Sequence, residues 1–234
     1  MKVASPKLVL FDLDGTLIDS AAGIFSSLDH AFAQIGVALP PREVLRTWIG
    51  PPFHQSFPTV LGDDAELVET AIAHYRDHYI ATGWAGHAVY PGIAELIQLL
   101  AADGRKLAIV TTKVSVQAKK IVASLPFGAA FAQVYGADLK TAHSAKAEMV
   151  AQALSDFAIA PAEAAMIGDR HFDIAGARAN GVRGIGVSWG FGSVEELTEA
   201  GAHALAHAPH ELAHLLSAPS AVSAAAIPAA APAP

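Results

Sequence analysis

Residues 7–17 read KLVLFDLDGTL, a short apolar run that ends abruptly in a polar segment containing a glycine. Such a run is typical of a central strand in a parallel sheet, because both faces of that strand are buried. Asp12 and Asp14 follow the run and are two residues apart, so their side chains can project to the same side. Functional sites of parallel α/β sheets lie at the carboxyl ends of the strands, and we therefore expect one here.

The chain beyond Pro91 alternates between short apolar runs and stretches with helical spacing. We expect strands at 106–112, 131–135, 164–167 and 184–187, and helices at 91–104, 116–124, 144–157, 172–179 and 209–216. This alternation is typical of a parallel sheet whose strands are joined by right-handed crossovers. The predicted fold class is α/β, with a Rossmann-like parallel sheet core and helices on both faces.

Residues 19–87 follow a different pattern, which predicts a small inserted all-helical cap. Apolar residues recur at helical spacing over 23–36 and over 64–82, and Gly36 and Gly83 are placed as helix stops. The predicted domains are an α/β core at 1–18 and 88–217, a helical cap at 19–87 and a disordered Ala/Pro-rich tail at 218–234.

The composition argues against nucleic acids and membranes as partners. The 234 residues carry a formal net charge of −7, and 53% of them are hydrophobic against 16% charged. The 15 Lys and Arg residues are scattered along the chain, which argues against a nucleic-acid partner. No apolar run reaches the roughly 20 residues that a membrane-spanning helix needs. We therefore expect no membrane partner. Asp12 and Asp14 also interrupt the N-terminal apolar run, which argues against a secretory signal, and we expect a cytoplasmic location. The expected assembly is a monomer or homodimer.

Two pairs of carboxylates follow predicted strands. Asp12 and Asp14 follow the first strand, while Asp169 and Asp173 follow the strand that ends at Ile167. Mg²⁺ prefers oxygen ligands and is usually held by one or two carboxylates together with substrate oxygens and water. These four residues are therefore the candidate metal ligands, and Mg²⁺ is the expected cofactor.

Groups that can bind a phosphate lie near the same strand ends. Gly15 has no Cβ, so backbone N–H groups can approach a phosphate closely. Thr111 is near the end of a predicted strand, where its hydroxyl can donate to a phosphate oxygen. Lys146 lies at the start of a predicted helix and can neutralise a transferring phosphoryl group. Lys113 and Lys140 remain alternatives for this last role.

Four of these motifs, in this order, resemble the signatures of the haloacid dehalogenase superfamily. Asp12-Leu13-Asp14-Gly15-Thr16-Leu17 resembles the first signature, and Gly168-Asp169 with Asp173 resembles the fourth. Thr111 resembles the second signature and Lys146 the third.

Within that superfamily the chain is similar to the phosphoglycolate phosphatase-like branch, whose helical cap follows the first motif. Residues 48–52, Trp-Ile-Gly-Pro-Pro, resemble a turn that recurs in those caps. Two positions depart from the pattern. Thr112 stands where many relatives carry Asn, and Ala147 follows Lys146 where Pro is frequent.

The resemblance implies a phosphatase that acts on a small-molecule phosphate ester, such as phosphoglycolate, a nucleotide or a sugar phosphate. Asp12 would attack phosphorus and carry an aspartyl-phosphate, and Asp14 would act as general acid and base. Mg²⁺ would be held by Asp12, the backbone carbonyl of Asp14 and Asp169, with Asp173 positioning bound water. Lys146 would offset the charge of the phosphoryl group. A phosphotransferase or mutase on the same scaffold, and a non-catalytic regulatory relative, are the alternatives.

The expected substrate-binding residues are Gly15, Thr111, Thr112 and Arg46. Arg46 is the preferred one of three arginines, with Arg42 and Arg76, that are the only Lys or Arg residues between positions 21 and 87. Any of them could pair with a substrate carboxylate. We interpret His171 as a surface or outer-sphere group rather than a metal ligand, and the same solvated role is expected for His203, His207, His210 and His214.

Overall fold

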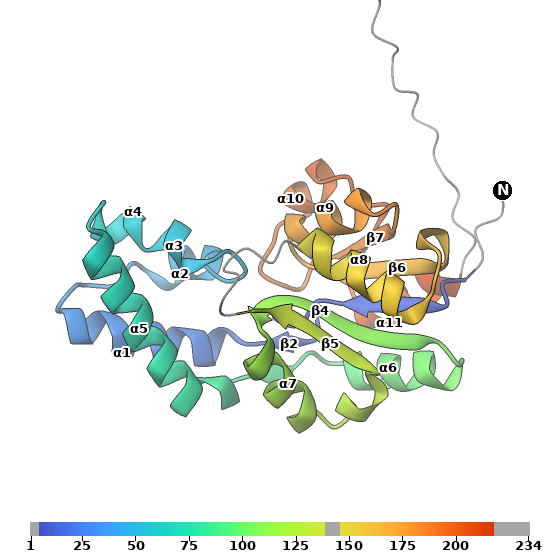
Figure 1. Cartoon of the computed structure of the whole chain (residues 1–234), viewed down its shortest axis with the longest axis horizontal. Helices are drawn as coiled ribbons and strands as arrows, with labels where there is room; N and C mark the ends of the chain where they lie inside the picture. Colours follow the sequence, from blue (N-terminus) through green and yellow to red (C-terminus); the bar gives the residue numbers. More distant parts are fainter. Residues whose placement is uncertain (1–4, 139–145, 218–234) are drawn as a thin grey trace, which may run out of the picture.

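The structure is a computed structural model of the chain and describes residues 5–138 and 146–217 (Figure 1). The predictions made for Lys140, for a helix start at Ser144 and for the tail at 218–234 lie outside these described residues. No helix within the described ranges is long and apolar enough to cross a membrane.

Within the described residues, six strands form one parallel sheet in the order β5-β4-β1-β6-β7-β8 (Figure 1). Their bounds are β1 (Leu8–Phe11), β4 (Lys106–Val114), β5 (Gln133–Ala137), β6 (Ala164–Gly168), β7 (Arg183–Val187) and β8 (Ala204–Ala206). The central strand β1 pairs with β4 on one side and β6 on the other. The α/β fold class is confirmed. The edge strand β8 was not predicted, because three residues are too few to show an alternating pattern.

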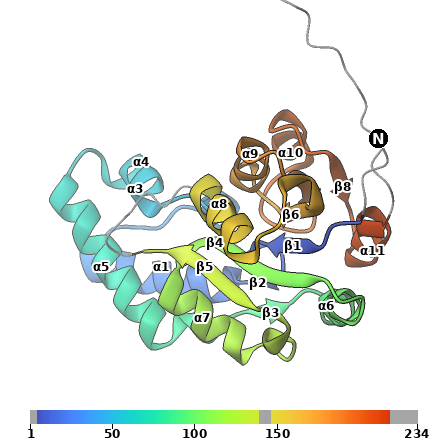
Figure 2. The same ribbon diagram turned by 45° about the vertical axis from the view of Figure 1, so that its right-hand side comes forward.

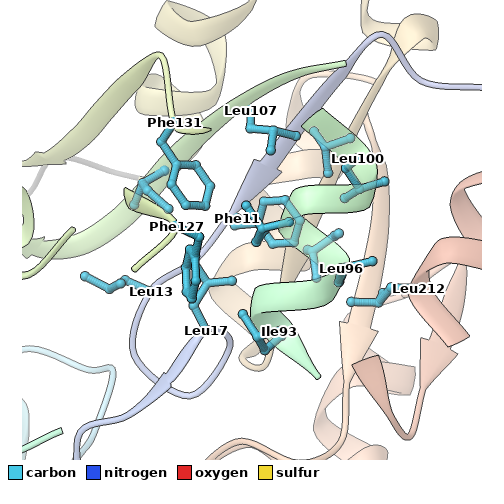
Figure 3. Packing of buried hydrophobic residues seen from close by; sticks show 14 of the residues in the cluster. Phe11, Leu13, Leu17, Ile93, Leu96, Leu100, Leu107, Phe127, Phe131 and Leu212 are labelled. Atoms are coloured by element: carbon cyan, nitrogen blue, oxygen red, sulfur yellow. The ribbon is translucent and has the colours of Figure 1, made fainter. Parts of the chain in front are cut away.

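Helices cover both faces of the sheet because successive side chains of β1 point to opposite faces. Val9 and Phe11 pack in one cluster with residues of α6 (Ile93–Ala102), α7 (Ser115–Ser124) and α11 (Pro209–Ser217) (Figure 3). Leu8 and Leu10 pack in another cluster with residues of α8 (Lys146–Phe157) and α9 (His171–Ala179). The short helix α10 (Val194–Glu199), which was not predicted, lies beside α9.

The α-helices between β2 (Ile18–Asp19) and β3 (Ala88–Val89) form a group beside the sheet, which we call the helical insert (Figure 2). They are α1 (Ala21–Ile35), α2 (Arg42–Thr47), α3 (Phe53–Ser56), α4 (Pro58–Leu61) and α5 (Ala65–Ala81). The two long helices α1 and α5 lie where helices were predicted, whereas the three short ones were missed because they hold too few turns for a helical period. The insert has its own core, in which Phe32, Trp48 and Phe57 pack on one another.

A short antiparallel ribbon joins the helical insert to the sheet. It consists of β2 (Ile18–Asp19) and β3 (Ala88–Val89), with Ile18 opposite Val89 and Asp19 opposite Ala88. The ribbon lies where the chain leaves and re-enters the sheet region, at the two positions chosen as domain boundaries. The division into a core domain and a cap domain stays a prediction.

Candidate active site

The sheet order brings the predicted site residues together at the carboxyl ends of the strands. Because β1 lies between β4 and β6, the loops that follow these three strands are neighbours. Asp12 follows β1, its backbone N–H donating to the carbonyl of Ile167 at 2.9 Å. Thr111 lies in β4 and Asp169 follows β6, and both side chains are buried.

Lys146, the first residue of α8, is the lysine that contacts Asp12 and Asp173. Its Nζ lies 2.7 Å from Oδ1 of Asp12 and 2.6 Å from Oδ1 of Asp173, and it donates to the carbonyl of Val110 at 2.9 Å. Burial by itself would lower the pKa of Lys146, but the two carboxylates hold that pKa above its ordinary value. The side chain therefore stays charged within the folded protein.

Three buried carboxylates form a compact group at these strand ends. Asp12, Asp169 and Asp173 each offer an oxygen, and these oxygens all lie within 4.8 Å of one another. Burial raises the pKa of Asp12 to about 6 against the pull of Lys146. Burial also raises the pKa of Asp169 well above its usual range, and the charges of the other two carboxylates add to this rise. An all-oxygen group with this excess of negative charge fits a hard cation such as Mg²⁺.

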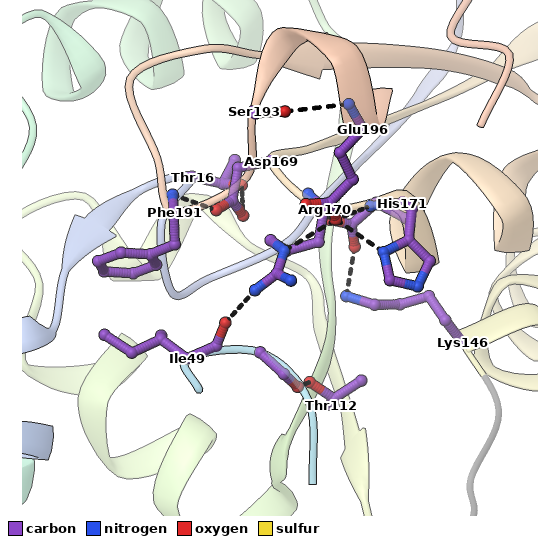
Figure 4. A network of polar contacts seen from close by, with 12 residues as sticks. Thr16, Ile49, Thr112, Lys146, Asp169, Arg170, His171, Phe191, Ser193 and Glu196 are labelled. Atoms are coloured by element: carbon purple, nitrogen blue, oxygen red, sulfur yellow. Dashed lines mark hydrogen bonds and ion pairs between the residues drawn. The ribbon is translucent and has the colours of Figure 1, made fainter. Parts of the chain in front are cut away.

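The loop after β1 is packed tightly against Asp169. Gly15 has a φ of +85°, and a Cβ at this position would lie 2.2 Å from Oδ2 of Asp169. The hydroxyl of Thr16 donates to Oδ1 of Asp169 at 3.3 Å (Figure 4). Gly15 is therefore required both for its backbone conformation and for the space that Asp169 occupies.

Sequence reasoning missed the loop that follows β7. The backbone N–H of Phe191 donates to Oδ2 of Asp169 at 2.8 Å (Figure 4), and the indole N–H of Trp189 donates to the carbonyl of Thr16 at 3.1 Å. A Cβ on Gly190 would lie 2.4 Å from the carbonyl oxygen of Gly15. The signal that could have identified this loop is Gly190-Phe191-Gly192, a glycine-rich segment just past a predicted strand.

Asp14 has a different partner from the other acids. Its Oδ2 accepts from Nζ of Lys113 at 2.8 Å, and this ammonium also lies 4.8 Å from the ring centre of Tyr79 in α5. Lys113 was an alternative to Lys146 for neutralising the phosphoryl group, and the structure places it instead beside Asp14. The predicted metal contact of Asp14 through its backbone carbonyl stays a prediction.

A cavity of about 270 Å³ lies between the carboxyl ends of the strands and the helical insert. Asp12 and Asp14 line it from the sheet side. Its other lining residues include Trp48, Ile49, Phe53, Tyr75, Arg76, Tyr79, Thr111, Thr112 and Lys113. Reactive groups at its base and a largely apolar wall are typical of small-molecule sites.

The three arginines of the insert have different positions. Arg76 lines the cavity. Arg46 is not among the lining residues, and its guanidinium carbon lies 5.2 Å from the ring centre of Phe191. Arg42 pairs with Asp29 at 2.6 Å between Nη2 and Oδ2. The preferred assignment of Arg46 to the substrate stays untested, and Arg76 is the arginine that the cavity wall contains.

The predicted substrate-binding threonines both line the cavity, but they have different contacts. The hydroxyl of Thr111 accepts from the backbone N–H of Lys113 at 3.2 Å. The hydroxyl of Thr112 donates to the carbonyl of Gly50 in the helical insert at 3.3 Å (Figure 4). Thr112 therefore also links the sheet to the insert.

Three of the histidines considered for metal binding have other contacts. Nδ1 of His171 lies 2.7 Å from Oε1 of Glu196, Nδ1 of His203 accepts from the backbone of Gly184, and Nδ1 of His207 lies 2.8 Å from the hydroxyl of Ser188. Among the described residues, the three aspartates are the one group of at least three side chains that could hold a metal.

Comparison with known proteins gives the same family. The sequence model of the haloacid dehalogenase-like hydrolases matches residues 9–187. The chain is 38% identical over 207 residues to a 5'-nucleotidase of Pseudomonas aeruginosa, covering 88% of this chain and 92% of that protein. It is 36% identical over 205 residues to the tyrosine-protein kinase PtkA of Mycobacterium tuberculosis, covering 87% of this chain and 69% of that one. The crystal structure of a predicted phosphatase from Clostridium acetobutylicum matches with a TM-score of 0.83 at 35% identity, covering 91% of this chain and 98% of that one.

The chain belongs to the haloacid dehalogenase-like hydrolase family. Within this family it is an enzyme of the phosphatase class, a phosphoric monoester hydrolase. The resemblance inferred from the four motifs is confirmed, and proteins named phosphoglycolate phosphatase are among the matching relatives.

Proposed function

We propose that this phosphatase hydrolyses a small-molecule phosphomonoester with Mg²⁺, through an aspartyl-phosphate formed on Asp12. The observation that carries the proposal is that Asp12 lines a cavity, pairs with the charged Lys146 and belongs to the group of three buried carboxylates. The similarity to a 5'-nucleotidase makes nucleoside monophosphates the first substrates to test. Phosphoglycolate and sugar phosphates are the next candidates.

In the first step an oxygen of Asp12 attacks phosphorus, and the bond from phosphorus to the ester oxygen breaks in line with it. Asp14 gives a proton to the departing oxygen. In the second step Asp14 takes a proton from water as that water attacks the phosphorus, and phosphate leaves from Asp12. Lys146 stabilises the negative charge around Asp12 in both steps.

Asp12, Asp169 and Asp173 are the side chains that would hold Mg²⁺, together with the backbone carbonyl of Asp14. When bound, Mg²⁺ neutralises charge on the phosphoryl oxygens and on the nucleophile. The helical insert would act as the cap domain over the cavity. Its residues would then contact the part of the substrate that does not react.

The experiment is a panel of phosphate esters assayed for release of inorganic phosphate by the purified protein. We expect turnover that EDTA abolishes and that Mg²⁺ restores better than Ca²⁺, because the larger ion accepts more ligands and can bind Asp12 through both oxygens. Asp12→Asn serves as the inactive control. A panel without any Mg²⁺-dependent turnover, or with equal turnover in the Asp12→Asn protein, would refute the proposal.

A second candidate is phosphotransfer, which the similarity to a tyrosine-protein kinase favours. The phosphoryl group on Asp12 would then pass to a hydroxyl of an acceptor instead of water. Incubation with ATP, Mg²⁺ and a tyrosine peptide separates the two activities. Phosphopeptide without matching release of inorganic phosphate would favour transfer, and release of phosphate alone would favour hydrolysis.

A further inference from the structure

In the sequence, Arg170 lies between Asp169 and Asp173, two acids of the buried group. Its side chain also contacts the helical insert. Its backbone N–H donates to Oδ2 of Asp173 at 3.0 Å, where it precedes the first turn of α9. Its side chain points the other way, and Nη1 donates to the carbonyl of Ile49 in the insert (Figure 4). One residue therefore contacts both a candidate metal ligand and the far wall of the cavity, because Ile49 is a lining residue.

The guanidinium of Arg170 is held in place by Glu196 of α10. Oε1 of Glu196 accepts from Nε of Arg170 at 2.9 Å and from the backbone N–H of His171 at 2.8 Å. The backbone N–H of Glu196 in turn donates to the hydroxyl of Ser193 at 3.1 Å, which caps α10. Only 12% of the Arg170 side chain is exposed. Because Glu196 fixes one side of the planar guanidinium of Arg170, the remaining N–H groups of that guanidinium point in a defined direction.

The turn of the insert at residues 48–52 fits against this guanidinium. Gly50 has a φ of +111°, and a Cβ there would lie 3.1 Å from Nη1 of Arg170. The carbonyl of Gly50 accepts from Thr112 of β4. Two neighbouring carbonyls of the turn, those of Ile49 and Gly50, are thus bound by the sheet side of the molecule.

We propose that Arg170 is a positioning residue that couples the seating of turn 48–52 over the cavity to the placement of Asp173 at the metal site. When the turn is seated, its carbonyl fixes the Arg170 side chain, and the Arg170 backbone that binds Asp173 is fixed with it. When the turn moves away, the start of α9 loses that restraint. The coupling rests on the proposed function, because it concerns the same metal site.

Coupling of this kind must act in both directions. We expect Mg²⁺ to slow hydrogen exchange of the amides in and next to turn 48–52 of the wild-type protein. In Arg170→Leu this segment should exchange faster, and Mg²⁺ should no longer slow it. Calorimetric titration with Mg²⁺ alone should show affinity weakened by about tenfold, the usual size of an effect on a ligand's supporting contact.

Arg178→Leu is the matched control, because Arg178 lies on the same helix but makes an exposed hydrogen bond to the carbonyl of Ala200 at the end of α10 rather than to the helical insert. It should leave both exchange and Mg²⁺ affinity unchanged. Arg170→Lys keeps the positive charge but lacks the planar guanidinium with its several N–H donors, so it should give an intermediate effect. This variant replaces Arg170→Leu if the leucine protein does not fold. Unchanged Mg²⁺ affinity in a folded Arg170 variant would overturn the coupling. Absence of Mg²⁺ binding by the wild type would refute both the proposed function and the coupling.

Discussion

Lys146 and Asp12 form a buried ion pair, with 2.7 Å between Nζ and Oδ1. The side chains are 5% and 9% exposed, so water screens this pair far less than it screens a pair on the surface. The same ammonium group also contacts Asp173. Because it serves two acids, Lys146 both supports the nucleophile and reduces repulsion within the carboxylate group.

Replacement of Lys146 by Met should lower kcat by about 10²–10³-fold, the range seen when a charge-stabilising donor is removed from an active site. The matched control is Lys7→Met, which removes an exposed lysine that pairs with Glu163. Ion pairs on the surface contribute little because water screens them, so the control should keep its activity and nearly all of its stability. Steady-state kinetics and thermal melting measure both effects. An active Lys146→Met protein would show that another cation has this role.

Asp12 should make the stability of the metal-free protein depend on pH. Burial raises the pKa of Asp12 from 3.8 to about 6. The folded state therefore binds more protons than the unfolded state between these values, and the free energy of unfolding falls as pH rises through this window. Thermal melting in EDTA measures the slope, which should be smaller in Asp12→Asn. An equal slope in the two proteins would assign the effect to other groups.

Gly15→Ala should reduce Mg²⁺ affinity and turnover, because the new Cβ would lie 2.2 Å from Oδ2 of Asp169. Gly36→Ala is the matched control. Gly36 also has a positive φ, of +70°, but a Cβ there meets nothing within 4 Å. It should therefore cost only the backbone strain of about 1 kcal/mol. Calorimetric titration with Mg²⁺ and thermal melting separate the two effects. Equal Mg²⁺ affinity in both variants would count against a tight fit at Gly15.

Asp14→Asn should separate the two proton transfers. p-Nitrophenolate leaves readily without an acid, so Asp12 should still be phosphorylated by p-nitrophenyl phosphate, whereas no base remains to activate water. We expect a burst of about one nitrophenolate per enzyme, followed by slow turnover. An alkyl phosphate, whose leaving group needs a proton, should give no burst. Rapid mixing measures both. If the variant loses activity equally with both esters and shows no burst, Asp14 has a metal-binding or structural role.

Arg76→Ala and Arg46→Ala should differ in their effect on KM. Arg76 lines the cavity, so its removal should raise KM for a nucleoside monophosphate more than for p-nitrophenyl phosphate. The sequence-based hypothesis instead predicts a selective rise in KM for Arg46→Ala with a carboxylate-bearing substrate such as phosphoglycolate, compared with p-nitrophenyl phosphate. The guanidinium of Arg46 lies over the ring of Phe191. If Arg46→Ala alone shows the selective rise in KM, the assignment to Arg76 is wrong.

The acids and Lys146 could be predicted because each belongs to a local pattern. Asp12 directly follows an apolar run that is typical of a buried strand, and Asp169 follows another such run after Gly168. Lys146 begins a helix with clear periodicity. Strand ends meet at one edge in any parallel sheet, so placing residues at those ends predicts their neighbours. The short helices α2, α3, α4 and α10 carry no such pattern, since their residues are helical through packing against longer elements.

The sequence by itself determined the α/β class, the position of the helical insert and the set of acidic residues at the strand ends, because these depend on spacing along the chain. Only the tertiary structure decided which cation meets which acid. Lys113 and Lys146 look alike in the sequence, yet one pairs with Asp14 and the other with Asp12. The tertiary structure also decided that Arg76 lines the cavity. This position depends on how the helical insert is placed against the sheet, and the spacing of residues within either part does not specify that placement.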